Sequence, residues 1–336
     1  CPVTCPCPGA HVFCRGCLSQ VRQLSCPYCR DSSDDVVRWM FQMARSEEAN
    51  ITHEHLTEAA RRGHVQLVEL MCTLGADVDL DARDESGTTA LCVAAQYGHL
   101  DVLRTLCEFG ADIDRTTDEG CTAMFLASLA GHLNVICWLL DHGADKEKAT
   151  ESGVTPLCIA AQEGHLEVVG SLCLAGADKN KVTQDGTTPL LMASQECHLE
   201  VVRFLCCEGA DMNKCRDDGL TPLYLAAQEG YVELVRLLCE QGADRDAAML
   251  DGATPLLVAS QEGHLDVVGL LCEKKADKEK ADRFGTTPLY LAAESGHLGV
   301  ARFLLQHGAD EDWTRQGGNG RSSDLLHVLN AITSSS

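Results

Sequence analysis

The chain has 336 residues, of which 45% are hydrophobic, 23% are charged and only 4% are aromatic. It can therefore bury one or two ordinary cores, and these must consist mainly of aliphatic side chains. The 27 Lys and Arg residues are outnumbered by 50 Asp and Glu residues, and the formal net charge of −23 argues against nucleic acid or an anionic membrane as the main partner. No run of 18 apolar residues occurs, so we expect no membrane-spanning helix.

The N-terminal residues differ from the rest of the chain in cysteine content and in charge. Seven of the 20 cysteines lie within the first 29 residues, and residues 1–45 hold five Arg but only three Asp. This head begins at Cys1 without a charged stretch followed by an apolar one, so we expect no signal peptide and interpret the sequence as starting inside a longer chain. We predict four segments: a cysteine-rich head at 1–32, a linker helix at 33–49, an array of eight repeats at 50–321, and a capping helix with a tail at 322–336.

A motif of the form T-[PA]-[LM]-x-x-A-[AS] recurs through the acidic body at a constant interval of 33 residues. Its seven copies begin at Thr89, Thr122, Thr155, Thr188, Thr221, Thr254 and Thr287. Thr suits the N-cap of a helix, and the Pro that follows it in most copies suits the first helical position. A Gly-His pair then allows a left-handed turn into a second helix, which a Gly-Ala-Asp triplet ends. Because helices this short are marginal alone, we predict stacked helix pairs linked by tight hairpin fingers.

The repeating unit resembles an ankyrin repeat, as in residues 221–244, TPLYLAAQEGYVELVRLLCEQGAD. The resemblance implies an all-α solenoid whose fingers and first helices form a concave protein-binding face. The family often has His after T-P-L, and this chain departs from that pattern in every copy. The residues at that position are Cys92, Phe125, Cys158, Leu191, Tyr224, Leu257 and Tyr290. The departure puts in question the usual His-mediated bonding between repeats, but not the fold.

In ankyrin repeats the variable binding positions flank the finger glycine and end the first helix. In the seven regular repeats these 35 positions hold 13 acids and a single base, Arg283. The candidate partner-binding residues are Glu85, Asp118, Glu119, Glu151, Glu163, Asp185, Glu196, Asp217, Asp218, Glu229, Asp251, Glu262 and Glu294. One interpretation is a face that attracts a basic protein partner electrostatically. The other is ordinary solvated surface.

Cysteine and histidine recur inside the repeats. One position of the second helix holds Cys72, Cys107, Cys173, Cys206, Cys239 and Cys272. Equivalent positions on stacked helices are too far apart for disulfides or a shared metal ion, so we predict that these thiols pack in the core. We expect the His of each Gly-His turn to make a structural hydrogen bond, and Cys207 to face solvent as the most reactive thiol. Cys197 replaces the turn glycine, which predicts strain of about 1 kcal/mol if its backbone is left-handed.

The head has metal-ligand spacing, with two C-x2-C pairs and a histidine. The candidate ligands of Zn²⁺ are Cys7, His11, Cys14, Cys17, Cys26 and Cys29. The alternative is a set of disulfides in a secreted protein, which the unpaired thiols of the repeats disfavour.

The order C-x3-H-x2-C-x2-C…C-P-x-C resembles the later part of a RING finger, a family that binds two zinc ions. The resemblance implies one site made by Cys7, His11, Cys26 and Cys29 and half of another made by Cys14 and Cys17. The first ligand pair of a RING is missing, so either it lies upstream or Cys1 and Cys5 form an irregular site. The resemblance also implies that Pro27 and Arg30 contact a ubiquitin-conjugating enzyme.

Two functions stay open at this point. One is a RING-type E3 ubiquitin ligase, which binds its substrate through the ankyrin array and a conjugating enzyme through the zinc head. The other is a non-enzymatic ankyrin scaffold with a structural or degenerate zinc knuckle. Neither assigns a catalytic side chain or a cofactor other than zinc, and the free thiols favour a reducing compartment, the cytoplasm or the nucleus.

Overall fold

The computed structural model describes residues 52–74 and 79–310, and in these residues it contains sixteen helices and no strand. The chain divides into two compact units, Cys1–Asp118 and Glu119–Ser336. The predicted head, linker helix and capping helix lie outside the described residues. None of the helices in the described parts of the chain could span a lipid bilayer.

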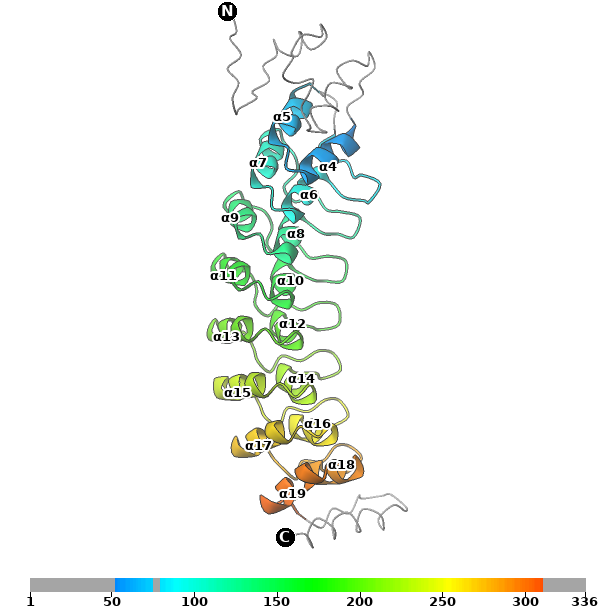
Figure 1. Ribbon diagram of the computed structural model, residues 1–336, viewed down its shortest axis with the longest axis vertical. Coiled ribbons are helices and arrows are strands. Elements are labelled where there is room, and N and C mark those ends of the chain that lie inside the picture. Colours follow the sequence, from blue (N-terminus) through cyan, green and yellow to red (C-terminus); the bar gives the residue numbers. More distant parts are fainter. Residues whose placement is uncertain (1–51, 75–78, 311–336) are drawn as a thin grey trace, which may run out of the picture. The chain divides into compact units, whose positions relative to one another are not determined.

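The described part of the N-terminal unit consists of two helix pairs (Figure 1). They are α4 (His53–Arg61) with α5 (Val65–Leu74), and α6 (Ala90–Gln96) with α7 (Leu100–Glu108). Contacts run from α4 to α6 and from α5 to α7, so the first helices pack side by side, as do the second helices.

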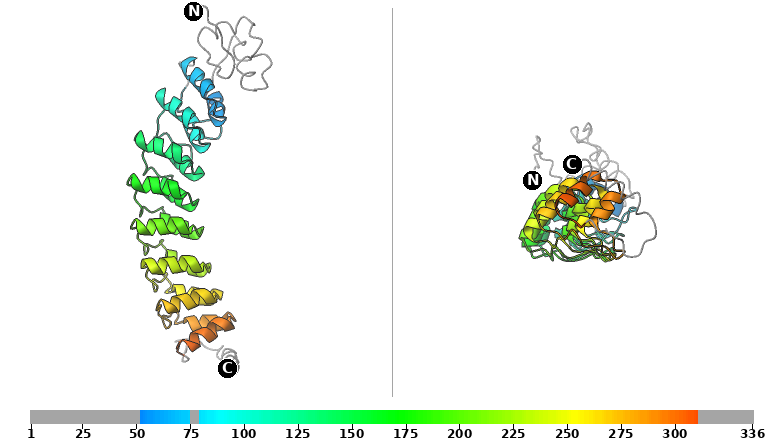
Figure 2. Two further views of the ribbon diagram at one scale, coloured as in Figure 1. Left: turned by 60° about the vertical axis from the view of Figure 1, so that its left-hand side comes forward. Right: turned by 90° about the horizontal axis from the view of Figure 1, so that it is seen from below.

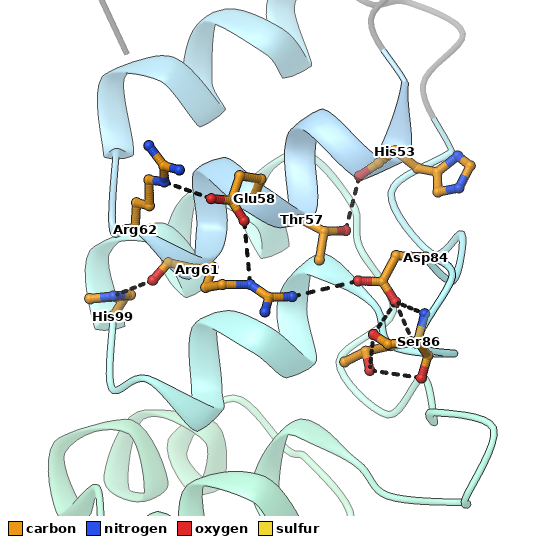
Figure 3. A network of polar contacts seen from close by, with 9 residues as sticks. His53, Thr57, Glu58, Arg61, Arg62, Asp84, Ser86 and His99 are labelled. Atoms are coloured by element: carbon orange, nitrogen blue, oxygen red, sulfur yellow. Dashed lines mark hydrogen bonds and ion pairs between the residues drawn. The ribbon is translucent and has the colours of Figure 1, made fainter. Parts of the chain in front are cut away.

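A polar network joins these two pairs (Figure 3). The Arg61 side chain lies 3.5 Å from the Glu58 carboxylate and 3.8 Å from that of Asp84, which belongs to the finger before α6. Asp84 also accepts hydrogen bonds from the backbone N–H of Ser86 at 3.0 Å and from its hydroxyl at 2.5 Å. The finger is therefore closed by its own aspartate and linked to the preceding helix by an arginine.

The C-terminal unit stacks six further helix pairs in chain order (Figures 1 and 2). The first helices are α8 (Ala123–Ala130), α10 (Pro156–Gln162), α12 (Pro189–Gln195), α14 (Pro222–Gln228), α16 (Pro255–Glu262) and α18 (Pro288–Glu294). The second helices are α9 (Leu133–Asp141), α11 (Leu166–Leu174), α13 (Leu199–Cys207), α15 (Val232–Gln241), α17 (Leu265–Glu273) and α19 (Leu298–Gln306). The fingers between repeats project beyond the first helices, on the side away from the second helices (Figure 1).

The start of each first helix confirms the predicted capping. In α12, the hydroxyl of Thr188 accepts a hydrogen bond from the backbone N–H of Leu191 at 3.1 Å, and Pro189 fills the first helical position. The same Thr cap closes every first helix from α6 to α18. These caps satisfy N–H groups that a helix of seven or eight residues would otherwise leave without partners.

The second helices bury one apolar stripe against their neighbours. In α11, Val168, Val169 and Leu172 are almost completely buried, whereas Leu166 and Leu174 on the same helix are exposed. Because only one face of each helix is covered within a repeat, the core is continuous along the stack rather than closed in each repeat.

The recurring His of the turn makes the predicted structural bond, but it bonds the preceding repeat. Nε2 of His165 donates to the carbonyl oxygen of Leu129 at 3.0 Å, and Nε2 of His198 donates to that of Gln162 at 2.8 Å. The acceptors are among the last carbonyls of first helices, which have no partner inside the helix. In the N-terminal unit His99 bonds Arg61 in the same way (Figure 3). Bonding between repeats therefore survives without a His after T-P-L.

A second polar ladder runs beside the Gly-Ala-Asp ends of the repeats. A carboxylate or amide oxygen of one repeat accepts the backbone N–H of the aspartate in the next, as from Asp178 to Glu147 (2.8 Å) and from Asp211 to Asn180 (2.8 Å). The bonds from Asp277 to Asp246 (2.9 Å) and from Asp310 to Glu279 (3.0 Å) continue the series. Together with the His bonds, these contacts fix the distance between successive repeats.

Candidate protein-binding surface

The fingers of the C-terminal unit are joined by backbone hydrogen bonds. Within a finger, the residue three before the glycine bonds the residue after it, as Thr150 N–H does to the carbonyl of Val154 at 3.0 Å. Between fingers, the N–H to carbonyl bonds are Gln184 to Ser152 (3.0 Å), Asp217 to Asp185 (3.1 Å), Leu250 to Asp218 (3.1 Å) and Arg283 to Asp251 (2.8 Å). The tips are thus held in a fixed row.

The finger glycines are needed for this close approach. Gly186 has φ +84°, and a Cβ atom there would lie 2.8 Å from Oδ1 of Asp217 and 3.0 Å from its backbone nitrogen. Any larger residue would both strain the turn and push the next finger away. The glycine therefore brings the acid of one finger directly over the finger before it.

The comparison with protein families identifies the array. The family model described as "Ankyrin repeats (3 copies)" matches residues 28–117, 56–150, 109–182, 157–249 and 242–315. The chain belongs to the ankyrin-repeat family. No curated protein matches it. The ankyrin resemblance and the helical solenoid are thereby confirmed, and ankyrin repeats support a role in protein–protein interaction. The family matches include no RING finger.

Most of the candidate partner-binding acids of the ankyrin array face solvent. Eleven of the thirteen are exposed, and the other two, Asp218 and Asp251, are partly buried. Glu85 and Asp118 belong to the N-terminal unit, and the other eleven belong to the C-terminal unit. The structure brings these eleven together along the fingers and at the ends of the first helices of one unit.

Side chains of neighbouring residues hold several of these acids, among them Asp218, Asp185 and Asp118. Asp218 lies 2.5 Å from Arg216 of its own finger, and this hydrogen bond lowers the pKa of its carboxyl. The hydroxyl of Thr183 bonds Asp185 and lowers the pKa of that carboxyl. In the N-terminal unit, Asp118 lies 3.3 Å from Nε of Arg83. Within residues 119–310, Asp218 is the only candidate acid with a cation at ion-pair distance.

Several of these acids act electrostatically on the buried side chain of Tyr224 in α14. Burial raises the pKa of this phenol to about 12, and the charges of Asp251, Glu262 and Asp218 add to the effect. The three acids come from two fingers and from the end of α16. Acids of two fingers and of one first helix thus surround Tyr224 with negative charge.

The recurring helix-2 cysteines carry free thiols that pack against neighbouring helices. Cys206 is buried, and Cys72, Cys107, Cys173, Cys239 and Cys272 are partly buried. Burial raises the pKa of Cys72, Cys107, Cys173 and Cys206 to about 11. Because the thiolate is the reactive form, these positions are poor nucleophiles, in line with the predicted packing role.

Cys207 is exposed, as predicted, but it is not alone. Cys137 in α9 and Cys215 in a loop are also exposed. The register of the repeats could have identified Cys137, because it occupies an outward position of its second helix.

In two repeats a residue other than glycine has a positive φ angle. Cys197 has φ 57°, so it meets the left-handed condition under which the sequence predicted strain, and Lys275 has φ 66°. The strain at Lys275 went unpredicted, although its place in the Gly-Ala-Asp triplet was visible in the repeat.

The replacement at Cys197 is paired with one in the next repeat. At the equivalent Gly230, a Cβ atom would lie 2.7 Å from the ring of His264, the turn histidine of the following repeat. The residue that lies in the next repeat at the position of His264, relative to Cys197, is Tyr231 and not a histidine. The turn histidine, which would clash with a Cβ atom, is therefore replaced by Tyr231 at the place where Cys197 supplies that Cβ atom.

The candidate zinc ligands and enzyme-contact residues all precede residue 52, so they lie outside the described residues. In residues 52–74 and 79–310, no group of three His, Cys, Asp or Glu side chains could hold a metal ion. The zinc site and the roles of Pro27 and Arg30 stay predictions from the sequence.

Proposed function

We propose that the ankyrin array binds a protein partner that presents a cluster of Lys and Arg side chains. The observation that carries this proposal is the row of eleven acids on the C-terminal unit, nine of them exposed and only one paired with a cation within residues 119–310. A basic partner would relieve the mutual repulsion of these acids and associate faster through electrostatic attraction.

The fingers support the same proposal by their rigidity. The hydrogen bonds between fingers, at 2.8 to 3.1 Å, order the tips before a partner arrives. A surface that is already ordered loses little conformational entropy on binding. The array therefore recognises its partner by the spacing and charge of preordered fingers, and not by loops that fold around it.

Binding of a fluorescein-labelled peptide tests the proposal. The probe is a twelve-residue peptide of alternating Lys and Ser, and the matched peptide carries Glu in place of Lys. We expect the Lys peptide alone to bind, with an affinity that falls as salt is raised. A salt-independent affinity, or equal binding of the Glu peptide, would contradict an electrostatic surface.

A pair of charge-removing variants locates the contact. Glu229→Gln with Glu262→Gln removes two exposed acids from the ends of α14 and α16. We expect about twofold to thirtyfold weaker binding, because each of the two exposed ion pairs that are lost is worth roughly 0.2–1 kcal/mol. The control, Glu167→Gln with Asp266→Asn, removes the same charge from exposed positions of the second helices α11 and α17. Equal weakening by both pairs would show that net charge alone matters.

A finer function rests on the head: an E3 ubiquitin ligase that passes ubiquitin to the protein held by the ankyrin array. Its support is the spacing of the six candidate ligands in residues 7–29, together with Pro27 and Arg30 at the positions where the resemblance places contacts to a conjugating enzyme. Bound zinc would hold the head in its folded form. The ligase itself would position the ubiquitin thioester for attack rather than form a covalent bond.

Two measurements on the full chain test this finer proposal. Metal analysis after dialysis should find zinc, and His11→Ala should lower the zinc content. Self-ubiquitination with activating enzyme, a panel of conjugating enzymes, ubiquitin and ATP should be lost on Arg30→Ala while the zinc content is kept. A full-length protein that holds zinc but has no activity with any conjugating enzyme would favour the scaffold.

A further inference from the structure

The last two described fingers of the C-terminal unit differ from the acidic fingers before them. Two residues before the finger glycine, successive repeats carry Glu151, Gln184, Asp217, Leu250 and Arg283. The residue immediately before the last of these glycines is Phe284, where the three preceding repeats have aspartate. In the last two of these fingers, Leu250 and Phe284 therefore bring apolar side chains into the row of acids, and Arg283 precedes Phe284 directly.

Both apolar side chains are largely in solvent. Leu250 is 77% exposed and Phe284 is 53% exposed. Neither supports the core, and exposing them costs free energy that an acid at the same position would not. Covering them with an apolar side chain of a partner would recover this free energy.

The backbone holds these two side chains on neighbouring tips. The N–H of Arg283 donates to the carbonyl of Asp251 at 2.8 Å, which joins the finger that carries Leu250 to the finger that carries Phe284. Gly252 allows this approach, because a Cβ atom there would lie 2.9 Å from the backbone nitrogen of Arg283. The guanidinium of Arg283 lies 4.7 Å from the centre of the Phe284 ring, which places a positive charge beside this member of the pair.

We propose that Leu250 and Phe284 form an anchor site for one bulky apolar side chain at the end of the basic segment that the acidic row binds. This inference rests on the proposed function and adds an apolar end to its partner. The cations of the segment would lie over the acids of the earlier fingers, and its apolar residue would cover the anchor site. Arg283 repels a further cation, so the basic cluster must lie on one side of the anchor only.

The charges around the anchor site disfavour other occupants. Asp218 and Asp251 belong to the same fingers or to the one before, so an anionic lipid surface would be repelled. Two exposed side chains also offer far less area than a stable interface between two copies of a chain needs.

Fluorescence polarisation with two labelled peptides tests the anchor site. One probe has six Lys residues alternating with Ser and ends in Leu-Phe, and the other has the same basic part and ends in Ala-Ala. We expect the full-length chain to bind the Leu-Phe probe about tenfold more tightly, equivalent to about 1.4 kcal/mol. Leu250→Ser with Phe284→Ser should remove this preference and leave the affinity for the Ala-Ala probe within about twofold of wild type.

Leu174→Ser provides the matched control. Leu174 is 88% exposed on α11, a second helix, so its replacement removes a similar exposed apolar side chain away from the fingers. This variant should keep the tenfold preference. Circular dichroism should show unchanged helix content in all variants, since all three side chains are at the surface.

Four results would overturn the anchor site. Equal affinity of the wild-type chain for the two probes, or a preference kept by the Leu250→Ser, Phe284→Ser variant, would refute the anchor while leaving the basic partner in place. Loss of the preference in Leu174→Ser would show that general surface hydrophobicity is responsible. Failure of both probes to bind would refute the proposed function together with the anchor.

Discussion

The joint between Cys197 and Tyr231 allows the contacts between repeats to be tested by a double-mutant cycle. Cys197→Gly removes a left-handed residue with φ 57°, whose strain is about 1–2 kcal/mol for a residue with a Cβ atom. The greater freedom of glycine in the unfolded chain offsets about 0.5–1 kcal/mol of that gain. We therefore expect this variant to be more stable by about 0.5 kcal/mol.

Tyr231→His should behave differently in the two backgrounds. In other repeats the His ring packs so closely against the turn glycine of the preceding repeat that a Cβ atom there would lie only 2.4 to 2.8 Å from the ring. With Cys197 present, an introduced His cannot occupy this position, because its ring would clash with the Cβ atom of Cys197. With glycine present it can, and its Nε2 can donate to the carbonyl of Gln195, which corresponds to the Gln162 and Gln228 acceptors.

The double variant should therefore exceed the sum of the single ones. The new hydrogen bond is worth about 0.5–1.5 kcal/mol, and relief of the contact adds to it, so we expect a coupling free energy of about 1–2 kcal/mol. Urea denaturation followed by circular dichroism gives the free energies of unfolding of all four proteins. Additivity within about 0.3 kcal/mol would refute the reasoning that the glycine and the histidine act as a pair.

Two further predictions follow from single positions. Gly170 lies inside α11, where a Cβ atom would have its nearest neighbour at an ordinary 3.8 Å, so Gly170→Ala should raise the free energy of unfolding by about 0.5–1 kcal/mol; a lower melting temperature would show that the helix cannot accept the methyl group. The pKa of Tyr224 is raised to about 12 from 10, so its contribution to stability is complete below pH 10 and is lost as the pH rises toward 12. Urea denaturation should show a loss of about 1 kcal/mol between pH 8 and pH 11 that Tyr224→Phe lacks, and identical pH profiles for the two proteins would contradict the buried phenol.

Local capping and turn chemistry could be predicted from single residues. The Thr caps, the Pro at the first helical position and the left-handed turn at Cys197 all depend on a few neighbouring atoms. The 33-residue register transferred each of them from one repeat to the next. The sequence also predicted a structural hydrogen bond for the turn histidine. Its acceptor in the preceding repeat could not be predicted, because it depends on the distance between stacked helices.

The surface was predicted less completely than the fold. Position in the repeat placed the acids on the fingers, but not the pairing of Asp218 with Arg216 inside one hairpin. The exposure of Leu250 and Phe284 could have been read from the same register, because both flank a finger glycine where other repeats carry acids. The zinc head stays a prediction, since residues 1–51 lie outside the part of the chain that the structure describes.

The pairing of Cys197 with Tyr231 also limits how this gene can change in length. Elsewhere a whole 33-residue segment could be lost or duplicated and each turn glycine would again meet a histidine. Excision of the segment that contains Tyr231 would instead bring His264 against Cys197, and insertion of a histidine-bearing copy at the same place would do likewise. Recombination between repeats should therefore be tolerated along most of the array and selected against at this one joint.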